Sequence, residues 1–168
     1  MILPIEKGSD NRILRTVSKP LKEITKKTIK LARDMEDTMH SVRGVGLAAP
    51  QIGLNDRIVI ITLNSGAILP LINPEIIESS KERDLREEGC LSLPGYWGKV
   101  NRIREVTVKF TTIKGQEVVM KFKGFEAQEV QHEVDHLNGK LFIDHLKPEE
   151  ITFDNHMKRV NEGEEDMD

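Results

Sequence analysis

The sequence predicts an α+β domain in which mostly antiparallel strands surround one central helix, with a second helix near the N-terminus and a short one near the C-terminus. Three observations predict this class. Two segments carry apolar residues at helical spacing, the stretch between them is rich in β-branched and alternating residues, and turn signals separate the segments. With 168 residues, 38% hydrophobic and 32% charged, the chain fits a single domain, which we expect to cover residues 1–160.

The first predicted helix covers residues 21–40. Its apolar stripe repeats at helical spacing and consists of Ile24, Thr28, Leu31, Met35 and Met39. Lysines and aspartates fill the other face, and Gly44 is the expected end signal. We interpret this helix as one that packs on the core and carries no chemistry.

Strands are expected in the middle of the chain. A β-branched run predicts a well-buried strand over residues 57–63, and short strands should follow at 69–72 and 75–78. Residues 106–110 and 118–122 alternate between apolar and polar side chains on either side of a Lys-Gly turn. This pattern predicts an antiparallel hairpin.

Helical spacing returns after the hairpin. Apolar residues recur over 125–137, and an Asn-Gly stop signal follows, so this segment is the expected central helix. A short helix is expected over 148–160, with a proline in its first turn. Residues 161–168 form an acidic tail that we expect to be disordered, because five of its residues are acidic.

Charge and cysteine content exclude several classes of protein. The 25 Lys and Arg residues against 28 Asp and Glu residues give a net charge of −3, which argues against a nucleic-acid binder held by phosphate contacts. The single cysteine, Cys90, rules out an intramolecular disulfide, and no apolar run approaches the roughly 20 residues that cross a bilayer. We therefore expect a cytoplasmic protein without a membrane segment or a direct nucleic-acid site.

The strongest chemical signal lies in the expected central helix, where residues 131–136 read Gln-His-Glu-Val-Asp-His. Residues four apart on a helix share one face with Cβ atoms about 5–6 Å apart, so His132 and His136 can bind one metal ion. Glu133 points about 100° around the axis, where its carboxylate can take a proton from water at that metal. The central helix is thus a predicted metal-binding helix. The other histidines lack ligand spacing and are expected at surface or cap positions: His40, His145 and His156.

Cys90 is the predicted third ligand. It lies in the run Glu-Gly-Cys-Leu-Ser at 88–92, and a catalytic metal site keeps three protein ligands and one open position. A thiolate with two neutral imidazoles leaves a divalent ion about one net positive charge, which still acidifies its water. Ligands of this softness suit Zn²⁺ or Fe²⁺ and do not choose between them.

A third motif, Gly-Val-Gly-Leu-Ala-Ala-Pro-Gln, occupies residues 44–51. Its glycines and alanines let the backbone come close to a ligand, and Gln51 offers an amide donor. It is not a phosphate loop, because neither the full glycine pattern nor the lysine of such loops is present.

Together, in this order and spacing, the three motifs closely resemble the signature of the bacterial-type peptide deformylases, over most of the chain up to about Leu146. The resemblance implies a metal-dependent hydrolase of protein biosynthesis. Such an enzyme removes the N-formyl group from the N-terminal methionine of newly synthesised polypeptides and releases formate.

The resemblance also implies roles for individual residues. The metal ligands would be Cys90, His132 and His136, and Glu133 would be the general acid/base. Gln51 and the backbone N–H of Leu91 would donate hydrogen bonds to the developing oxyanion. Substrate-binding positions would be Val45, Gly46, Gly89 and Leu91, with Val130 also near the methionine pocket. One divalent ion per chain is implied, with Fe²⁺ expected in the cell and Zn²⁺, Ni²⁺ or Co²⁺ as alternatives.

Three features need separate interpretation. Glu129 stands where apolar residues are more common in the family; if it lines the pocket, either the preference for methionine weakens or its stem folds aside. Arg102 either pairs with Glu88 to hold the ligand segment or is a plain surface charge. The C-terminal segment is similar to the helical ending of Gram-negative-type members, some of which dock on the ribosome, and Lys158 and Arg159 would suit such a partner.

Two other functions share the histidine motif. A small zinc metalloendopeptidase would take its third ligand downstream, from His145, Glu149 or Glu150. A non-catalytic metal-binding module would close the site with a fourth protein ligand, although such sites usually use several cysteines.

Overall fold

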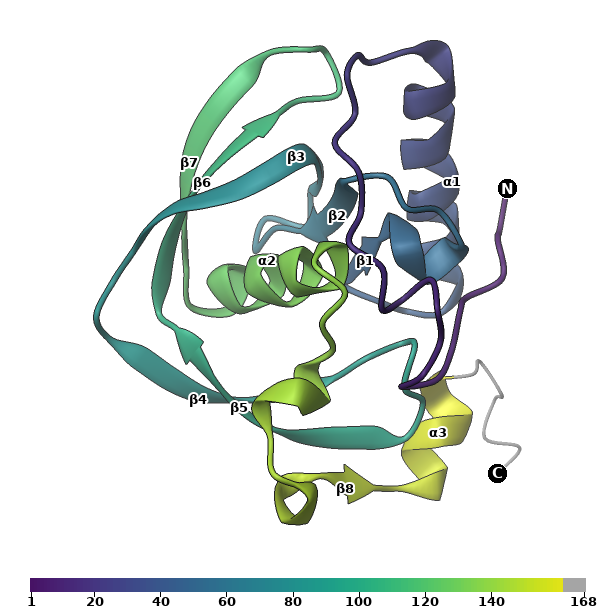
Figure 1. Ribbon diagram of the computed structural model, residues 1–168, viewed down its shortest axis with the longest axis vertical. Coiled ribbons are helices and arrows are strands. Elements are labelled where there is room, and N and C mark those ends of the chain that lie inside the picture. The colour runs from purple at the N-terminus through teal and green to yellow at the C-terminus, as the bar shows by residue number, and fades with distance from the viewer. Residues whose placement is uncertain (162–168) are drawn as a thin grey trace.

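The computed structural model describes residues 1–161, so the predicted acidic tail lies outside the described residues except for Asn161. Figure 1 shows α2 at the centre, with strands curving around it and α1 to one side. The helices are α1 (Lys26–Ser41), α2 (Gly124–Leu137) and α3 (Asn155–Asn161). The strands are β1 (Gly46–Ala48), β2 (Ile58–Thr62), β3 (Ile68–Ser79), β4 (Arg83–Gly89), β5 (Tyr96–Ile103), β6 (Glu105–Thr111), β7 (Glu117–Lys123) and β8 (Thr152–Phe153).

Two antiparallel sheets surround α2. The larger has the strand order β1-β2-β3-β6-β7 and the smaller the order β4-β5-β8. The apolar face of α2 is buried in the main core cluster, where Ala127, Val130 and Val134 join strand residues such as Val59 and Val108. The α+β class, the antiparallel strands and the central helix are confirmed.

The first helix is shorter than predicted. It begins at Lys26, after Thr25, whose extended backbone (φ −112°, ψ 175°) makes it the N-cap, while the backbone of Leu21 is held by the side chain of Asn73 in two hydrogen bonds of 2.8 Å. At the observed N-terminus of α1, the Thr25 N–H donates a hydrogen bond to Thr28 Oγ1 and so caps the helix. At the other end Arg43, and not Gly44, takes the left-handed conformation, with φ 55°.

The strand predictions need one correction. The two short strands expected at 69–72 and 75–78 form the single strand β3, which bends where Asn73 adopts φ 51° and the register with β6 shifts. The hairpin is confirmed as β6 and β7, with Val108 opposite Met120. Strand β4, which pairs with β5, carries charged side chains at most of its positions, so no alternation of apolar and polar residues predicts it.

The expected helix over 148–160 is wrong in its first half. Residues Pro148–Glu150 form one 3₁₀ turn, and Thr152 and Phe153 then pair with Trp97 and Tyr96 as strand β8. Helix α3 starts only after Asp154, whose Oδ1 accepts the N–H of His156 at 2.8 Å. Pairing of Thr152 and Phe153 with the edge of β5 therefore outweighs the weak helical spacing of the apolar residues in this segment.

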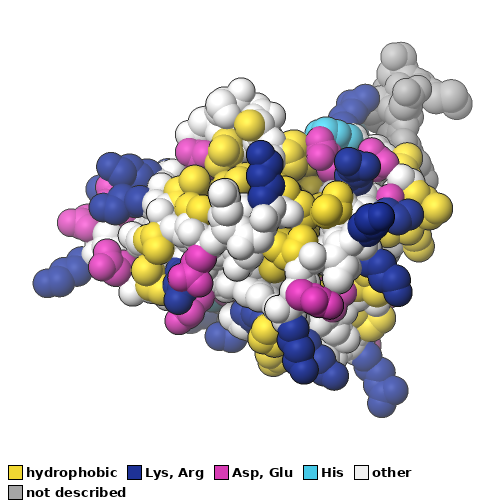
Figure 2. Space-filling model, turned by 90° about the horizontal axis from the view of Figure 1, so that it is seen from above, with side chains coloured by type: hydrophobic (Ala, Val, Ile, Leu, Met, Phe, Trp, Pro, Cys, Tyr) yellow, Lys and Arg dark blue, Asp and Glu magenta, His cyan; other side chains and the backbone are white. Residues whose placement is uncertain are grey.

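No described helix is long and apolar enough to span a membrane. On the face seen in Figure 2, cationic and anionic side chains alternate, with hydrophobic ones between them. That face therefore carries no large patch of one sign.

Candidate metal centre

Two elements bring the three predicted ligands together. Helix α2 presents His132 and His136 from consecutive turns, with their Nε2 atoms 3.2 Å apart. Cys90 follows directly after β4, and its Sγ lies 3.3 Å from His136 Nε2. The three residues are buried, and their donor atoms all lie within 4.8 Å of one another.

These donors fit one metal ion. Bonds of about 2.3 Å to sulfur and 2.0–2.1 Å to nitrogen in a tetrahedral site place neighbouring donors about 3.3–3.6 Å apart, close to the separations seen here. Among the described residues, Cys90, His132 and His136 form the group that could hold a metal ion. The group does not include His145, Glu149 or Glu150, which a metalloendopeptidase would use as the third ligand. His145 instead lies 2.8 Å from Asp135. The site is thus built for a single ion.

A buried ionic network holds the first histidine in place. His132 Nδ1 lies 2.8 Å from Glu88 Oε1, so its Nε2 is free to bind a metal. Arg102 donates to both oxygens of Glu88, at 2.6 and 2.7 Å, and to Asp135 at 2.8 Å. Arg102 is only 4% exposed, which settles its role as a partner of Glu88 and excludes a plain surface charge.

The network shifts the pKa values of its members. Burial alone would raise the pKa of Glu88, but the hydrogen bonds from Arg102 and His132 lower it to about 2. Burial likewise opposes ionisation of Cys90, yet the neighbouring imidazoles of His136 and His132 lower its pKa to about 5. Glu88 is therefore a carboxylate, and Cys90 is poised to bind metal as a thiolate.

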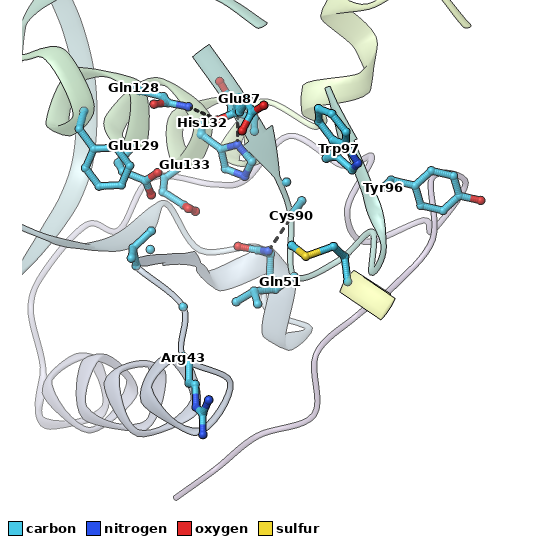
Figure 3. A pocket seen from close by; sticks show the side chains of 18 of the residues that line it. Arg43, Gln51, Glu87, Cys90, Tyr96, Trp97, Gln128, Glu129, His132 and Glu133 are labelled. Carbon is cyan, nitrogen blue, oxygen red and sulfur yellow. Dashed lines mark hydrogen bonds and ion pairs between the residues drawn. The ribbon is translucent and has the colours of Figure 1, made fainter. Parts of the chain in front are cut away.

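Glu133 is the buried carboxylate beside the ligands. Its Oε2 has no hydrogen-bond partner among the described residues, and burial raises its pKa well above the usual value. A Cβ on Gly46 would lie 2.7 Å from Glu133 Oε1 and 3.1 Å from Glu129 Oε2. Glycine at position 46 is thus required for this approach, and Figure 3 shows the side chains of Glu129 and Glu133 next to each other.

An amide faces the cysteine from the opposite wall. Gln51 is 1% exposed, and its Oε1 accepts the N–H of Ala48 at 3.0 Å. This bond turns Nε2 toward Ser92 Oγ, at 3.1 Å, and Cys90 Sγ, at 3.6 Å (Figure 3). The amide N–H₂ group is consequently held at the metal end of the pocket.

A pocket of about 530 Å³ opens from this centre. All four predicted substrate-binding positions line it, namely Val45, Gly46, Gly89 and Leu91. Glu129 lines it as well, and burial raises the pKa of its carboxyl group. Val130 lies in the main core cluster and not on the pocket wall.

Sequence reasoning did not assign pocket roles to several lining residues: Arg43, Glu87, Tyr96, Trp97, Phe125, Asp154 and Met157. The sequence pattern identifies Trp97 only as an aromatic residue in a turn and Phe125 only as a residue of the central helix. Asp154 and Met157 reach the pocket because β8 pairs with β5, a contact that no local pattern signals.

A buried helix that offers two imidazoles to one ion, next to a buried carboxylate, is the arrangement of single-metal hydrolases, and this is the class that the fold and the site define. The family model for polypeptide deformylase matches residues 2–151. The chain belongs to the polypeptide deformylase family. It is accordingly a hydrolase that removes the N-formyl group from newly synthesised polypeptides.

Individual relatives and solved structures support the family assignment. A peptide deformylase of Halothermothrix orenii is 51% identical over 85% of this chain and 92% of its own length, and one of Carboxydothermus hydrogenoformans is 50% identical over 79% and 86%. Among solved structures, a class I type b peptide deformylase of Acinetobacter baumannii superposes with a TM-score of 0.83 at 39% identity, covering 87% of this chain and 99% of that one. The peptide deformylase of Thermotoga maritima gives 0.83 at 36% identity, covering 88% and 99%.

Proposed function

We propose that Cys90, His132 and His136 hold one Fe²⁺ ion in the cell, with Zn²⁺, Ni²⁺ or Co²⁺ as replacements, and that deformylation takes place at this centre. The observation that carries the proposal is the convergence of one sulfur and two nitrogen donors beside Glu133 and Gln51. An ion there would supply a Lewis acid for the formyl oxygen and acidify water.

Glu133 is the proposed general acid/base. Its buried carboxylate, with Oε2 unpartnered among the described residues, is free to accept a proton from the attacking water. The formamide C–N bond then breaks, and Glu133 returns that proton to the leaving amine. Water and formyl-peptide are consumed, and formate and a free amino terminus are produced.

Two donors are proposed to stabilise negative charge on the formyl oxygen. Gln51 Nε2 is fixed in position by the bond between its own Oε1 and Ala48. The backbone N–H of Leu91 is next to Cys90, and Leu91 lines the pocket. Donors held in place before the reaction cost no reorganisation when the charge develops.

The substrate is proposed to lie extended between Val45–Gly46 and Gly89–Leu91, with the methionine side chain in the adjoining part of the pocket. Glu129 adds a carboxylate to this part, which weakens methionine preference unless its stem folds aside when substrate binds. In the cytoplasm, the nascent chain at the ribosome would be the source of this substrate, and Lys158 and Arg159 on α3 are the proposed contact.

The test is release of formate from formyl-Met-Ala-Ser by protein loaded anaerobically with Fe²⁺ or Ni²⁺. We expect one formate and one free amine per peptide consumed, and no product from acetyl-Met-Ala-Ser. Protein that binds one metal ion per chain but releases no formate would overturn the proposal.

A further inference from the structure

The ionic network behind His132 does not end at Arg102. Arg102 Nη1 donates to Asp135 Oδ2 at 2.8 Å, and His145 Nε2 lies 2.8 Å from the same oxygen. The His145 side chain is 37% exposed, so a continuous chain of contacts runs from a buried metal ligand to a histidine at the surface. Asp135 and His145 neither belong to the ligand group nor line the pocket. The proposed reaction therefore leaves this part of the network without a role.

The hydrogen bond between His145 and Asp135 has one direction. A carboxylate oxygen only accepts, so Nε2 of His145 carries a hydrogen and donates to Asp135. Arg102 Nη1 lies 3.5 Å from the same Nε2, and two N–H groups cannot bond to each other. Both donors consequently share Oδ2 of Asp135.

The residues on either side of His145 fix its position. Asp144 pairs with Arg15 at 2.6 Å and holds the 3₁₀ turn that ends at His145. Leu146 packs against the smaller sheet, where a Cβ on Gly98 would collide with its Cδ1 atom. The imidazole is thus carried on a turn that is anchored before and after it.

The single cation of this network is shared between two carboxylates. Arg102 makes two hydrogen bonds to Glu88 and one to Asp135. A stronger bond to Asp135 would draw the guanidinium away from Glu88, the carboxylate that contacts His132. The N–H of His145 occupies part of the acceptor capacity of Asp135 and so limits this pull. Its effect reaches the metal ligand through connected hydrogen bonds.

We propose that His145 is a positioning residue for the metal centre. It acts through the carboxylate of Asp135 and the guanidinium of Arg102. These two groups fix Glu88, the carboxylate that orients the ligand His132. The inference rests on the proposed function, because it requires an ion at the three ligands.

The test measures the affinity of the protein for Co²⁺ alone, by competition with a chelator, and the visible absorption of the bound ion, which reports its ligand geometry. Changing a group in direct contact with a ligand typically costs about 10–100-fold in affinity, and Glu88→Gln is the reference for this case. His145 is more distant, so His145→Leu should bind Co²⁺ roughly three- to tenfold more weakly than the parent, with shifted absorption.

A conservative variant separates the hydrogen bond from packing. His145→Gln offers an amide N–H to the same oxygen and should keep the Co²⁺ affinity within about twofold of the parent. His40→Leu is the matched control, because His40 is exposed on α1 and is not part of the network. It should leave affinity and absorption unchanged. Equal losses in His145→Gln and His145→Leu would overturn the proposal.

A double-mutant cycle tests the route of the effect. In protein that already carries Asp135→Ala, the further change His145→Leu should not alter Co²⁺ affinity, because the acceptor of its hydrogen bond is gone. A second loss as large as that of the single variant would show that His145 acts through other contacts and would contradict the proposed route.

Failure of this inference and failure of the proposed function give different results. Parent protein that does not bind one Co²⁺ ion per chain would refute the proposed metal centre itself. If the parent binds one ion and His145→Leu binds it with the same affinity and absorption, the metal centre stands and the positioning role of His145 is wrong.

Discussion

The two ends of the pocket differ in how tightly their residues are fixed. At the inner end, Cys90, Glu133 and His136 are 6%, 2% and 1% exposed. At the outer end, Tyr96 and Met157 are more than 40% exposed. A buried charge or ligand that loses its partner has no solvent to replace it, whereas an exposed side chain is already solvated. Substitutions should therefore cost orders of magnitude at the inner end and small factors at the outer end.

The largest loss is expected for Glu133→Gln, because proton transfer by a positioned group contributes on the order of 10²–10⁴ in rate. The variant should retain one metal ion per chain, since Glu133 is not among the three ligands. Formate release and metal content measured on the same sample check both statements. Glu129→Gln, on the same helix and in the same pocket, is the matched control and should stay within roughly tenfold of the parent. Comparable losses in both variants would contradict the assignment of the base.

Arg102→Met should lower the free energy of unfolding by about 3–5 kcal/mol, since it leaves Glu88 buried without its cation. Arg104→Met is the control: Arg104 pairs with Asp84 at 2.8 Å but is half exposed, so its removal should cost about 0–1 kcal/mol. Denaturant unfolding measures both. Equal costs would show that the ionic network at the inner end is no stronger than a surface pair.

Gln51→Ala should reduce kcat on the order of 10²–10³-fold with metal binding retained, as expected for loss of one oxyanion donor. Gln128→Ala removes another pocket amide, one that donates to Glu87 O at 2.8 Å and does not face Cys90, and should have a much smaller effect. Near-normal turnover in Gln51→Ala would show that this amide does not stabilise the oxyanion.

The smallest inner-end effect concerns acid stability. The folded-state pKa of Glu88 is lowered from 4.5 to about 2, so its contribution is present above pH 4.5 and is lost as the pH falls toward 2. A shift of this size corresponds to about 3 kcal/mol. The free energy of unfolding should therefore fall more steeply over this range in the parent than in Glu88→Gln. Parallel curves would mean that Glu88 is not specially stabilised as a carboxylate.

The same contrast explains what the sequence could predict. The inner end is encoded by short motifs. Helical spacing places His132 and His136 on one face of α2, and the three-ligand count of a catalytic site predicts Cys90, the single cysteine of the chain, as their partner. Residues that reach the site through strand pairing left no such pattern. Asp154 and Met157 arrive because β8 binds the edge of β5, and this tertiary contact also replaced the predicted helix over 148–160.

Hydrogen bonds between distant segments account for the other differences between the predicted and the observed elements. Asn73 holds the backbone of Leu21, which keeps the first residue of the predicted helix out of α1. The same residue bends β3 without ending it, which is why one strand was expected as two. Hydrogen bonds between segments about 50 residues apart are not readable from periodicity.

The most direct test of the account is X-ray absorption at the metal edge of the Zn²⁺-loaded protein, compared with Cys90→Ser. We predict one sulfur neighbour at about 2.3 Å and two imidazole nitrogens at about 2.0–2.1 Å, with the sulfur lost in the variant. A parent spectrum without a sulfur neighbour, or one unchanged by Cys90→Ser, would contradict a metal centre built from Cys90, His132 and His136.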